Sequence, residues 1–148
     1  MATIRGFEFP EDRYYLVDKH VWCLPIESGP VRVGLTPVVY HLLKYSLVAI
    51  SVRPKALGQE VPAGRSVAMV ESLKYNGPLP APFTGIVLRA NETVMADPET
   101  AAADPYGAGW IVEMQPADWA AASAALLAGE AALVAYRTLL ENQNITNE

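Results

Sequence analysis

The chain has 148 residues, 51% of them hydrophobic, which is sufficient for one globular domain with its own core. Its formal net charge of −5 at pH 7 argues against nucleic acid as a partner, because phosphate binding requires a basic surface. No apolar stretch approaches the roughly 18 residues of a membrane span, and the charged start "MATIRGFEFPED" is unlike a secretion signal.

The first two thirds of the chain predict short strands, because runs of aromatic and β-branched residues alternate with turn-forming residues. Thr36 supplies an N-cap hydroxyl and Pro37 suits the first helical position, which predicts a short helix through about Tyr45. Residues 53–64 form a turn-rich connection. The predicted strands are residues 14–17, 20–24, 31–35, 47–52, 66–72, 85–91 and 110–114.

The last third changes from an irregular loop to a helical pattern. Asp97 and Pro98 can open a helical turn, and "PYGAG" then forces an irregular loop. After Pro116, the alanine- and leucine-rich run "ADWAAASAALLAGEAALVAYRTLLENQ" predicts one long helix. The final "NQNITNE" predicts a frayed tail. The apolar stripe expected to dock this helix on the sheet is Trp119, Ala122, Leu126, Leu133, Tyr136 and Leu140.

The inventory of reactive residues indicates a protein without catalytic activity of its own and without a metal site. Metal-ligand spacings such as H-x-x-x-H or C-x-x-C are absent, as are the nucleophile-elbow, P-loop and dinucleotide-binding motifs. The single cysteine, Cys23, cannot form an internal disulfide, which predicts a reducing, cytoplasmic location. Its apolar context favours a buried hydrophobe over a reactive thiol. For His20 and His41, a structural role is favoured over a ligand or general base.

A short internal repeat surrounds one lysine. Gly64 and Gly85 each precede a strand and are followed, seven and eight positions later, by a glutamate and a hydroxyl residue. Lys74 lies almost midway between the two glycines, so two similar β-units joined by a hairpin would place it at the most projecting point of a flattened sandwich. The alternative is an ordinary solvated lysine, which describes most lysines.

The residues around Lys74 suit an attachment point for a swinging group. The strand "SVAMVES" positions the turn, and the prolines of "GPLPAPFTG" stiffen the return limb by restricting φ. Acylation would turn the ammonium into a neutral amide. Leu73 and Tyr75 flank the lysine and can contact a modifying ligase, a partner enzyme or the attached arm.

From about Tyr14 to Met114 the sequence resembles the glycine cleavage system H protein family, a lipoyl-carrying relative of the biotinyl/lipoyl domains. The matching motifs are "HVW", "VGLT", "GQEVPAG", "VESLK", "PAPFTGIVLRANE" and "DPYGAGWIVEM". The resemblance implies a mainly β, flattened lipoyl/biotinyl-type sandwich (a barrel-sandwich hybrid) with short helices and a long C-terminal helix. It also implies covalent lipoate on Lys74, attached by a lipoate-protein ligase or lipoyl transferase. Leu73 and Tyr75 argue against biotin, whose carriers place methionine on both sides of the lysine.

The same resemblance divides the chain into four parts. Residues 1–13 are an N-terminal extension, 14–114 the lipoyl domain, 115–142 a C-terminal helix packed on that domain, and 143–148 a flexible tail. His20 and Glu71 are expected in strands near the hairpin, where they can approach the base of the arm, and ordinary polar strand positions are an equal alternative. Tyr106 and Trp110 are interpreted as anchors of the irregular loop.

Several departures from the H protein pattern favour a different cargo. Val21 replaces the usual glutamate of H-E-W, and "PVVYHLLKYS" and "YNGPLPAP" differ from the family's usual segments. The start "GFEFPEDRYYLVDKHVW", together with a lysine followed by an aromatic residue, x, Gly and Pro, resembles the lipoate-binding proteins of the sulfur-oxidising heterodisulfide-reductase-like (sHdr) system. That resemblance implies a non-catalytic carrier that shuttles sulfur intermediates between sulfur-transfer proteins and a heterodisulfide-reductase-like complex.

Two alternatives stay open. The first is the H protein of glycine cleavage, which carries an aminomethyl group among the P, T and L proteins of that system. The second is an unlipoylated structural or regulatory binder.

Overall fold

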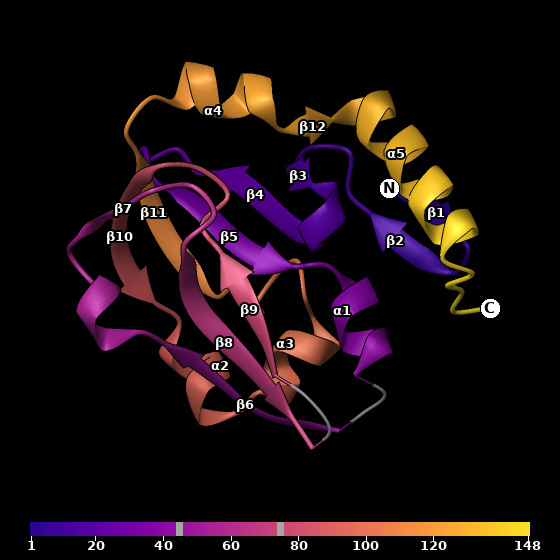
Figure 1. The fold of residues 1–148 in the computed structure, drawn as a ribbon, viewed down its shortest axis with the longest axis horizontal. Coiled ribbons are helices and arrows are strands. Elements are labelled where there is room, and N and C mark those ends of the chain that lie inside the picture. The colour runs from indigo at the N-terminus through magenta and orange to yellow at the C-terminus, as the bar shows by residue number, and fades with distance from the viewer. Residues whose placement is uncertain (44–45, 74–75) are drawn as a thin grey trace.

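The computed structural model describes residues 1–43, 46–73 and 76–148, and most of its strands lie in two antiparallel sheets (Figure 1). The larger sheet has seven strands in the order β12-β3-β4-β5-β11-β10-β7, and the smaller has the order β6-β8-β9. The members of the larger sheet are β3 (Tyr14–Leu16), β4 (Val21–Pro25), β5 (Val31–Leu35), β7 (Glu60–Val61), β10 (Gly85–Ala90), β11 (Val112–Pro116) and β12 (Leu127–Ala128). Those of the smaller sheet are β6 (Leu47–Val52), β8 (Ser66–Ser72) and β9 (Asn76–Pro80). The mainly β sandwich with a C-terminal helix that the sequence predicted is thereby confirmed.

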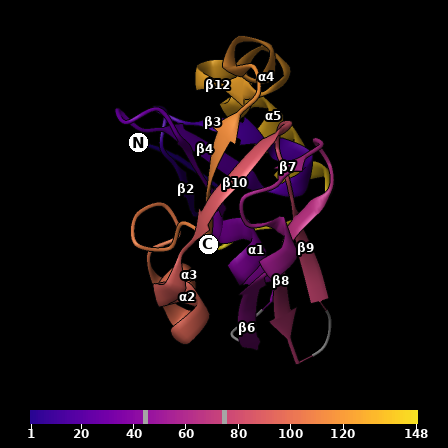
Figure 2. The ribbon, with the colours of Figure 1, turned by 90° about the vertical axis from the view of Figure 1, so that its left-hand side faces the viewer.

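Short helices and one further hairpin complete the described chain. The hairpin of β1 (Ala2–Ile4) and β2 (Phe7–Phe9) precedes the larger sheet. Figure 2 shows α4 and α5 at one end of the molecule, and α2, α3 and the β8–β9 hairpin at the other. The helices are η1 (Val17–Lys19), α1 (Pro37–Leu42), η2 (Pro54–Ala56), α2 (Glu92–Ala96), α3 (Glu99–Ala103), α4 (Trp119–Ala125) and α5 (Gly129–Asn142).

The larger of two apolar clusters lies between the sheets. It takes Val33 and Val112 from the seven-stranded sheet, and Ile50, Val70 and Leu79 from the three-stranded sheet, all of them at most 2% exposed. Burial of this apolar surface is the main free energy that holds the two sheets together. The smaller sheet, and with it the β8–β9 hairpin, is therefore a packed part of the fold.

The start of α1 follows from its sequence. Thr36 occupies the N-cap position and Pro37 the first helical position, as predicted, although the Thr36 hydroxyl makes no capping bond to a backbone N–H. The helix ends at Leu42, and the predicted end at Tyr45 lies outside the described residues. Asp97 and Pro98 act only partly as predicted: the Asp97 side chain accepts a hydrogen bond from the Glu99 backbone N–H, but Pro98 is the N-cap residue and α3 begins at Glu99.

The expected single helix of residues 115–142 is instead two helices separated by a short strand. Gly129 has a φ of 55°, a left-handed conformation that interrupts the helix. The two residues of β12 pair with β3 as Leu127↔Tyr15 and Ala128↔Tyr14. Strand pairing on the sheet edge replaces helical hydrogen bonds at this point. The predicted apolar stripe is divided accordingly: Trp119, Ala122 and Leu126 pack on the larger cluster, and Leu133, Tyr136 and Leu140 on the smaller one.

Both termini are packed against the domain. Phe7 and Phe9 are at most 1% exposed, and the Phe9 ring stacks on Tyr136 of α5 with centroids 4.3 Å apart. The expected flexible tail of residues 143–148 makes defined contacts instead. Ile145 is buried, and the Asn147 N–H donates to the Arg5 carbonyl at 2.8 Å. Arg5 in turn donates from Nε to the Ile145 carbonyl at 2.7 Å.

Candidate functional site

The β8–β9 hairpin reverses the chain at the free end of the smaller sheet. Its register pairs Val70 with Gly77 and Glu71 with Asn76, so the reversal falls between Glu71 and Asn76. Leu73 is 80% exposed, and its backbone N–H donates to the Ser46 carbonyl at 3.0 Å. This bond connects the start of the turn to the residue before β6. The start of the turn is thus bonded to the segment before β6, and the strands that lead into and out of the turn pair with each other.

The prolines of the return limb lie within β9, where the sequence predicted a stiffened segment. Pro78 pairs with Met69, and Pro80 pairs with Ser66. Because β9 is at the edge of the sheet, a proline can lack its N–H there without losing an internal ladder bond. The fixed φ of each proline restricts the backbone of this limb.

The two halves of the internal sequence repeat share a glycine and a strand but otherwise differ in structure. Gly64 precedes β8 and Gly85 begins β10, and the two strands lie in different sheets. Gly64 has a positive φ of 91°, whereas Gly85 is needed because a Cβ there would collide with the Gln115 carbonyl. Glu71 still lies within β8, whereas Glu92 begins α2, so the two units differ in structure at this position.

A groove of about 200 Å³ lies between η1, α1 and the β8–β9 hairpin. Its walls are mostly aliphatic, with Asp18, Lys19 and His20 along one side. The lining residues are Asp18, Lys19, His20, Leu35, Val39, Leu42, Leu43, Val70, Gly77 and Pro78. Val39 and Leu43 are four residues apart, so they share one face of α1, and Val70, Gly77 and Pro78 come from the hairpin. Helical spacing of the apolar residues in "PVVYHLLK" indicates such a face, which was not among the predicted site features.

His20 connects this groove to the C-terminal helix. It was expected in a strand, but it ends η1 in a left-handed conformation with a φ of 59°, and β4 begins only at Val21. Its ring stacks on Tyr136, with centroids 5.9 Å apart, and its Nδ1 lies 3.5 Å from the Tyr136 hydroxyl oxygen. Burial lowers the pKa of His20, and the nearby Asp18 carboxylate opposes that shift. This shift favours the neutral imidazole, which can act as a hydrogen-bond partner at the groove.

The comparisons with known proteins agree with this architecture. The family described as glycine cleavage H-protein matches residues 13–138. The chain belongs to the glycine cleavage H-protein family. "Glycine cleavage system H protein 5" of Aquifex aeolicus is 34% identical over 149 residues, covering 98% of each chain. "Probable glycine cleavage system H protein 2" of Saccharolobus solfataricus is 33% identical over 148 residues, covering 99% of this chain and 97% of that protein.

A solved H protein has the same fold. The crystal structure of a glycine cleavage system H protein from Mycobacterium marinum superposes with a TM-score of 0.72 at 34% identity. The superposition covers 93% of this chain and 100% of the Mycobacterium marinum chain. Family membership therefore extends over the sandwich and most of the C-terminal region, and is not limited to the hairpin.

The predicted site residues of this H-protein-family chain do not all lie together in the structure. Lys74 and Tyr75 lie outside the described residues, so both remain predictions. Leu73 is strongly exposed beside the turn. His20 lines the groove together with Val70. Glu71 follows Val70 in β8, so its side chain points to the opposite face of the strand and does not line the groove.

The remaining reactive residues have structural surroundings. Cys23 is fully buried in the larger cluster, and burial raises the pKa of its thiol. His41 meets the Phe7 ring edge-on at 5.2 Å between centroids. Within residues 1–43, 46–73 and 76–148, no cluster of His, Cys, Asp and Glu could hold a metal ion. Over the same residues, no helix has the length and apolar character needed to cross a bilayer.

The irregular loop is anchored by aromatic residues, as interpreted from the sequence. The Tyr106 hydroxyl donates to the Glu8 carbonyl at 2.8 Å, and Trp22 donates from Nε1 to the Pro105 carbonyl at 3.1 Å. Trp110 packs beneath two guanidinium groups, those of Arg32 and Arg89, at 5.1 and 5.2 Å from its ring centre. These contacts hold the loop against both the N-terminal hairpin and the larger sheet.

A charged cluster on the larger sheet was not predicted. Glu113 of β11 accepts hydrogen bonds from Arg89 of β10 at 2.6 Å and from Arg32 of β5 at 2.9 Å. Its side chain is only 5% exposed. The hydrogen bonds from Arg89, and then those from Arg32, hold the pKa of Glu113 below its usual range although burial acts in the opposite direction. The cluster thus links three adjacent strands.

We expect Glu113→Gln to lower the free energy of unfolding by about 1–2 kcal/mol near pH 7, because two arginines lose their charged partner. A depressed pKa in the folded state means that this contribution is present above the unfolded pKa and is lost as the pH falls through the folded value. Urea denaturation of both proteins should therefore show a difference that shrinks toward about pH 3. Glu130→Gln, an exposed acid at the start of α5, is the control. A difference independent of pH would contradict the electrostatic explanation.

Proposed function

We propose that this protein is a lipoyl carrier without catalytic activity of its own, with lipoate attached to Lys74. The observation that carries the proposal is the match to the H-protein family over residues 13–138, in a chain whose β8–β9 hairpin reverses between Glu71 and Asn76. Lys74 falls within that interval of the sequence. The exposed Leu73 beside it leaves this edge of the hairpin accessible to a lipoate-protein ligase or lipoyl transferase.

The residues next to the hairpin fit a lipoyl arm. Val39, Leu43, Val70 and Pro78 give the groove an aliphatic lining, which suits the hydrocarbon chain and the sulfur ring of lipoate. The groove volume of about 200 Å³ matches a group of this size more closely than a large cofactor. When bound, lipoate supplies a disulfide that can be reduced to a dithiol and can take up and release a small group. The protein supplies the attachment point, the groove and the surface on which partners dock.

The comparisons favour an aminomethyl cargo over the sulfur cargo that the sequence motifs favoured. The matched relatives, including those of Aquifex aeolicus and Saccharolobus solfataricus, are named glycine cleavage system H proteins, as is the solved structure. In that role the carrier receives an aminomethyl group from a pyridoxal-phosphate decarboxylase and passes it to a folate-dependent aminomethyltransferase. Its partners are then the P, T and L proteins of glycine cleavage.

Sulfur carriage is the second candidate, and the groove gives a specific reason for it. A loaded aminomethyl group bears a positive charge, which a carboxylate would hold. Val21 stands where the H protein pattern has glutamate, and it is fully buried in the larger cluster. The described groove wall has one carboxylate, that of Asp18, next to the cationic Lys19. This lining is compatible with a neutral or anionic sulfur cargo delivered by sulfur-transfer proteins and accepted by a heterodisulfide-reductase-like complex.

The two cargoes are separated by one exchange experiment. Lipoylated protein is mixed with glycine decarboxylase and labelled bicarbonate, and the label in glycine is followed. Exchange at the rate of an authentic H protein supports the aminomethyl role and overturns the sulfur role. Absence of exchange, together with a persulfide-type mass increase after exposure to a sulfur-transfer protein, reverses that conclusion.

An unlipoylated binder is tested separately by intact-mass spectrometry. The protein is purified from a host that attaches lipoate to its own carriers. A population that carries lipoate supports both carrier roles. A population that stays entirely unmodified in that host would overturn the carrier proposal, whichever cargo is considered.

A further inference from the structure

A charged pocket lies within the connection between β6 and β8. It has a volume of about 290 Å³ and is lined by residues of η2 and β7, by residues that flank them, and by the first residue of β8. The Arg53 backbone N–H donates to the Val67 carbonyl at 3.0 Å, so the connection begins beside the strand to which it returns. Compact surface loops whose ends lie close together are frequently functional. The pocket is at the start of β8, whereas the proposed attachment hairpin follows the other end of this strand, at Ser72.

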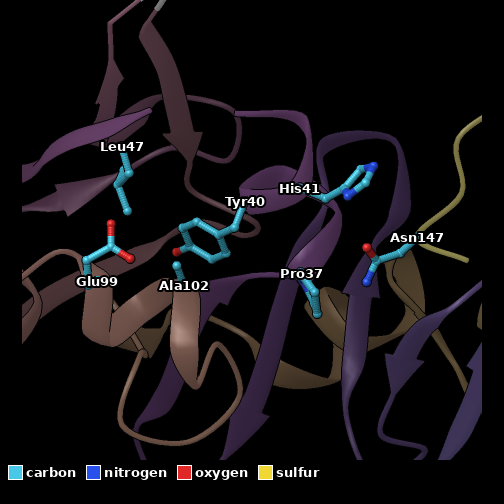
Figure 3. Close-up of a pocket in the computed structure, with 7 residues that line it drawn as sticks. All are labelled: Pro37, Tyr40, His41, Leu47, Glu99, Ala102 and Asn147. Atoms are coloured by element: carbon cyan, nitrogen blue, oxygen red, sulfur yellow. The ribbon is translucent and has the colours of Figure 1, made fainter. Parts of the chain in front are cut away.

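The lining of this pocket has an excess of positive charge. Arg53, Lys55 and Arg65 line it, and Glu60 is the one acid among its described lining residues. This excess is local, because the whole chain has a net charge of −5. The cavity beside α1, shown in Figure 3, is different: its described lining has one carboxylate, that of Glu99, and no lysine or arginine. Positive charge thus gathers at the β6–β8 connection against the overall charge of the protein.

The three cationic residues of the pocket are accessible and unpaired. Arg53, Lys55 and Arg65 are each exposed to solvent. None of their side chains forms an ion pair or a hydrogen bond within the part of the chain that the structure describes. Like charges that share a pocket repel one another, and a bound anion offsets that repulsion. The N–H groups of these side chains can therefore contact an anion that enters from solvent.

We propose that this pocket binds a phosphate dianion, either inorganic phosphate or the phosphate group of a small metabolite. The guanidinium groups of Arg53 and Arg65 offer paired N–H donors that match phosphate oxygens, and the Lys55 ammonium adds a compact charge. Three cations and one carboxylate leave an excess of two positive charges, which the dianion balances. A carboxylate ligand would balance only half of that excess, and a volume of about 290 Å³ limits the ligand to a small molecule. The site is separate from the proposed carrier function and does not depend on lipoate.

The test is an NMR titration of the full-length, isotope-labelled protein, followed at the backbone N–H signals of residues 53–66. The probes are inorganic phosphate, glycerol 3-phosphate and acetate, at constant ionic strength set with sodium chloride. We expect saturable shifts with phosphate, and binding about tenfold weaker in Arg53→Gln and in Arg65→Gln, because each substitution removes hydrogen bonds between charged groups. Acetate should bind at least about tenfold more weakly than phosphate, because it carries a single charge. Tighter binding of glycerol 3-phosphate than of inorganic phosphate identifies a phosphorylated metabolite as the source, and the reverse order identifies free phosphate.

A matched variant and a competing ligand complete this test. Arg137→Gln removes an exposed arginine of α5, outside the pocket, and should bind phosphate as the parent protein does. A triglutamate peptide tests whether the pocket instead takes an acidic segment of a partner protein. The proposal is overturned if the peptide or acetate binds as tightly as phosphate, or if no probe gives saturable shifts. It is also overturned if Arg53→Gln and Arg65→Gln leave binding unchanged, or if Arg137→Gln weakens binding as much as they do.

Discussion

Substitution of Lys74 by arginine is expected to abolish lipoate attachment while leaving the fold intact. Amide formation requires a primary amine that can lose its proton, whereas the guanidinium of arginine remains charged at every accessible pH. The charge of the side chain is retained, so the acidic protein keeps its net charge of −5. Incubation with a lipoate-protein ligase, lipoate and ATP, followed by intact-mass spectrometry, measures the modified fraction directly.

The other lysines of the chain provide the control. They are Lys19, Lys44 and Lys55, and Lys55 is exposed in η2. Lys55→Arg is expected to be lipoylated to the same extent as the parent protein, because a ligase must recognise the β8–β9 hairpin and not an arbitrary surface amine. If Lys74→Arg is still modified, or if Lys55→Arg is not, the attachment site proposed here is wrong although the family membership stands.

Replacing Gly34 by alanine should lower the free energy of unfolding by about 3 kcal/mol, the upper part of the usual cost of overpacking. Gly34 is in β5 opposite Trp22, and an added Cβ would lie 2.6 to 2.7 Å from three atoms of the indole ring. The ring cannot easily move, because Trp22 is fully buried, donates to the Pro105 carbonyl and lies under the Arg13 guanidinium. The backbone of Gly34 does not have a positive φ, so steric overlap alone accounts for the expected loss. Urea denaturation of the parent protein and of Gly34→Ala measures this loss of unfolding free energy.

A double-mutant cycle with Trp22→Phe isolates that contact. The smaller phenyl ring leaves space for a methyl group, so Gly34→Ala should cost at least about 1 kcal/mol less in the Trp22→Phe protein than in the parent. Equal costs in both backgrounds would show that the effect of Gly34→Ala does not come from the indole. In that case the account of the Trp22 environment given above would be incorrect.

Much of the sandwich could be predicted because strand signals are local. The run "VRVGL" became β5 and "SVAMVES" became β8 with the predicted bounds, since alternation and turn residues act over a few neighbours. The same holds for Thr36 and Pro37 at the start of α1. The C-terminal helix was harder, because its interruption depends on the pairing of Leu127 and Ala128 with a strand more than a hundred residues earlier. Helical propensity contains no information about such a partner.

Of the candidate site, the hairpin could be predicted from the sequence but the groove could not. The hairpin around Lys74 follows from "SVAMVES" and the prolines after it, whereas the groove needs three segments that are distant in the chain. His20, Val39 and Val70 meet only after the two sheets and α1 have packed together. The same packing turns Glu71 away from the groove. Residue type also gave no sign that Glu113 would be buried between two arginines, because isolated glutamates are normally exposed.

The sequence by itself determined that the chain forms a mainly β domain, because strand periodicity and turn chemistry are encoded in adjacent residues. Its resemblance to the H-protein family implied which lysine is the candidate for modification. Only the tertiary structure decided what surrounds that hairpin: the groove beside it and the histidine that lines this groove and contacts α5. Those features arise where side chains from remote segments share one volume, and close packing determines that volume only once the whole core has formed.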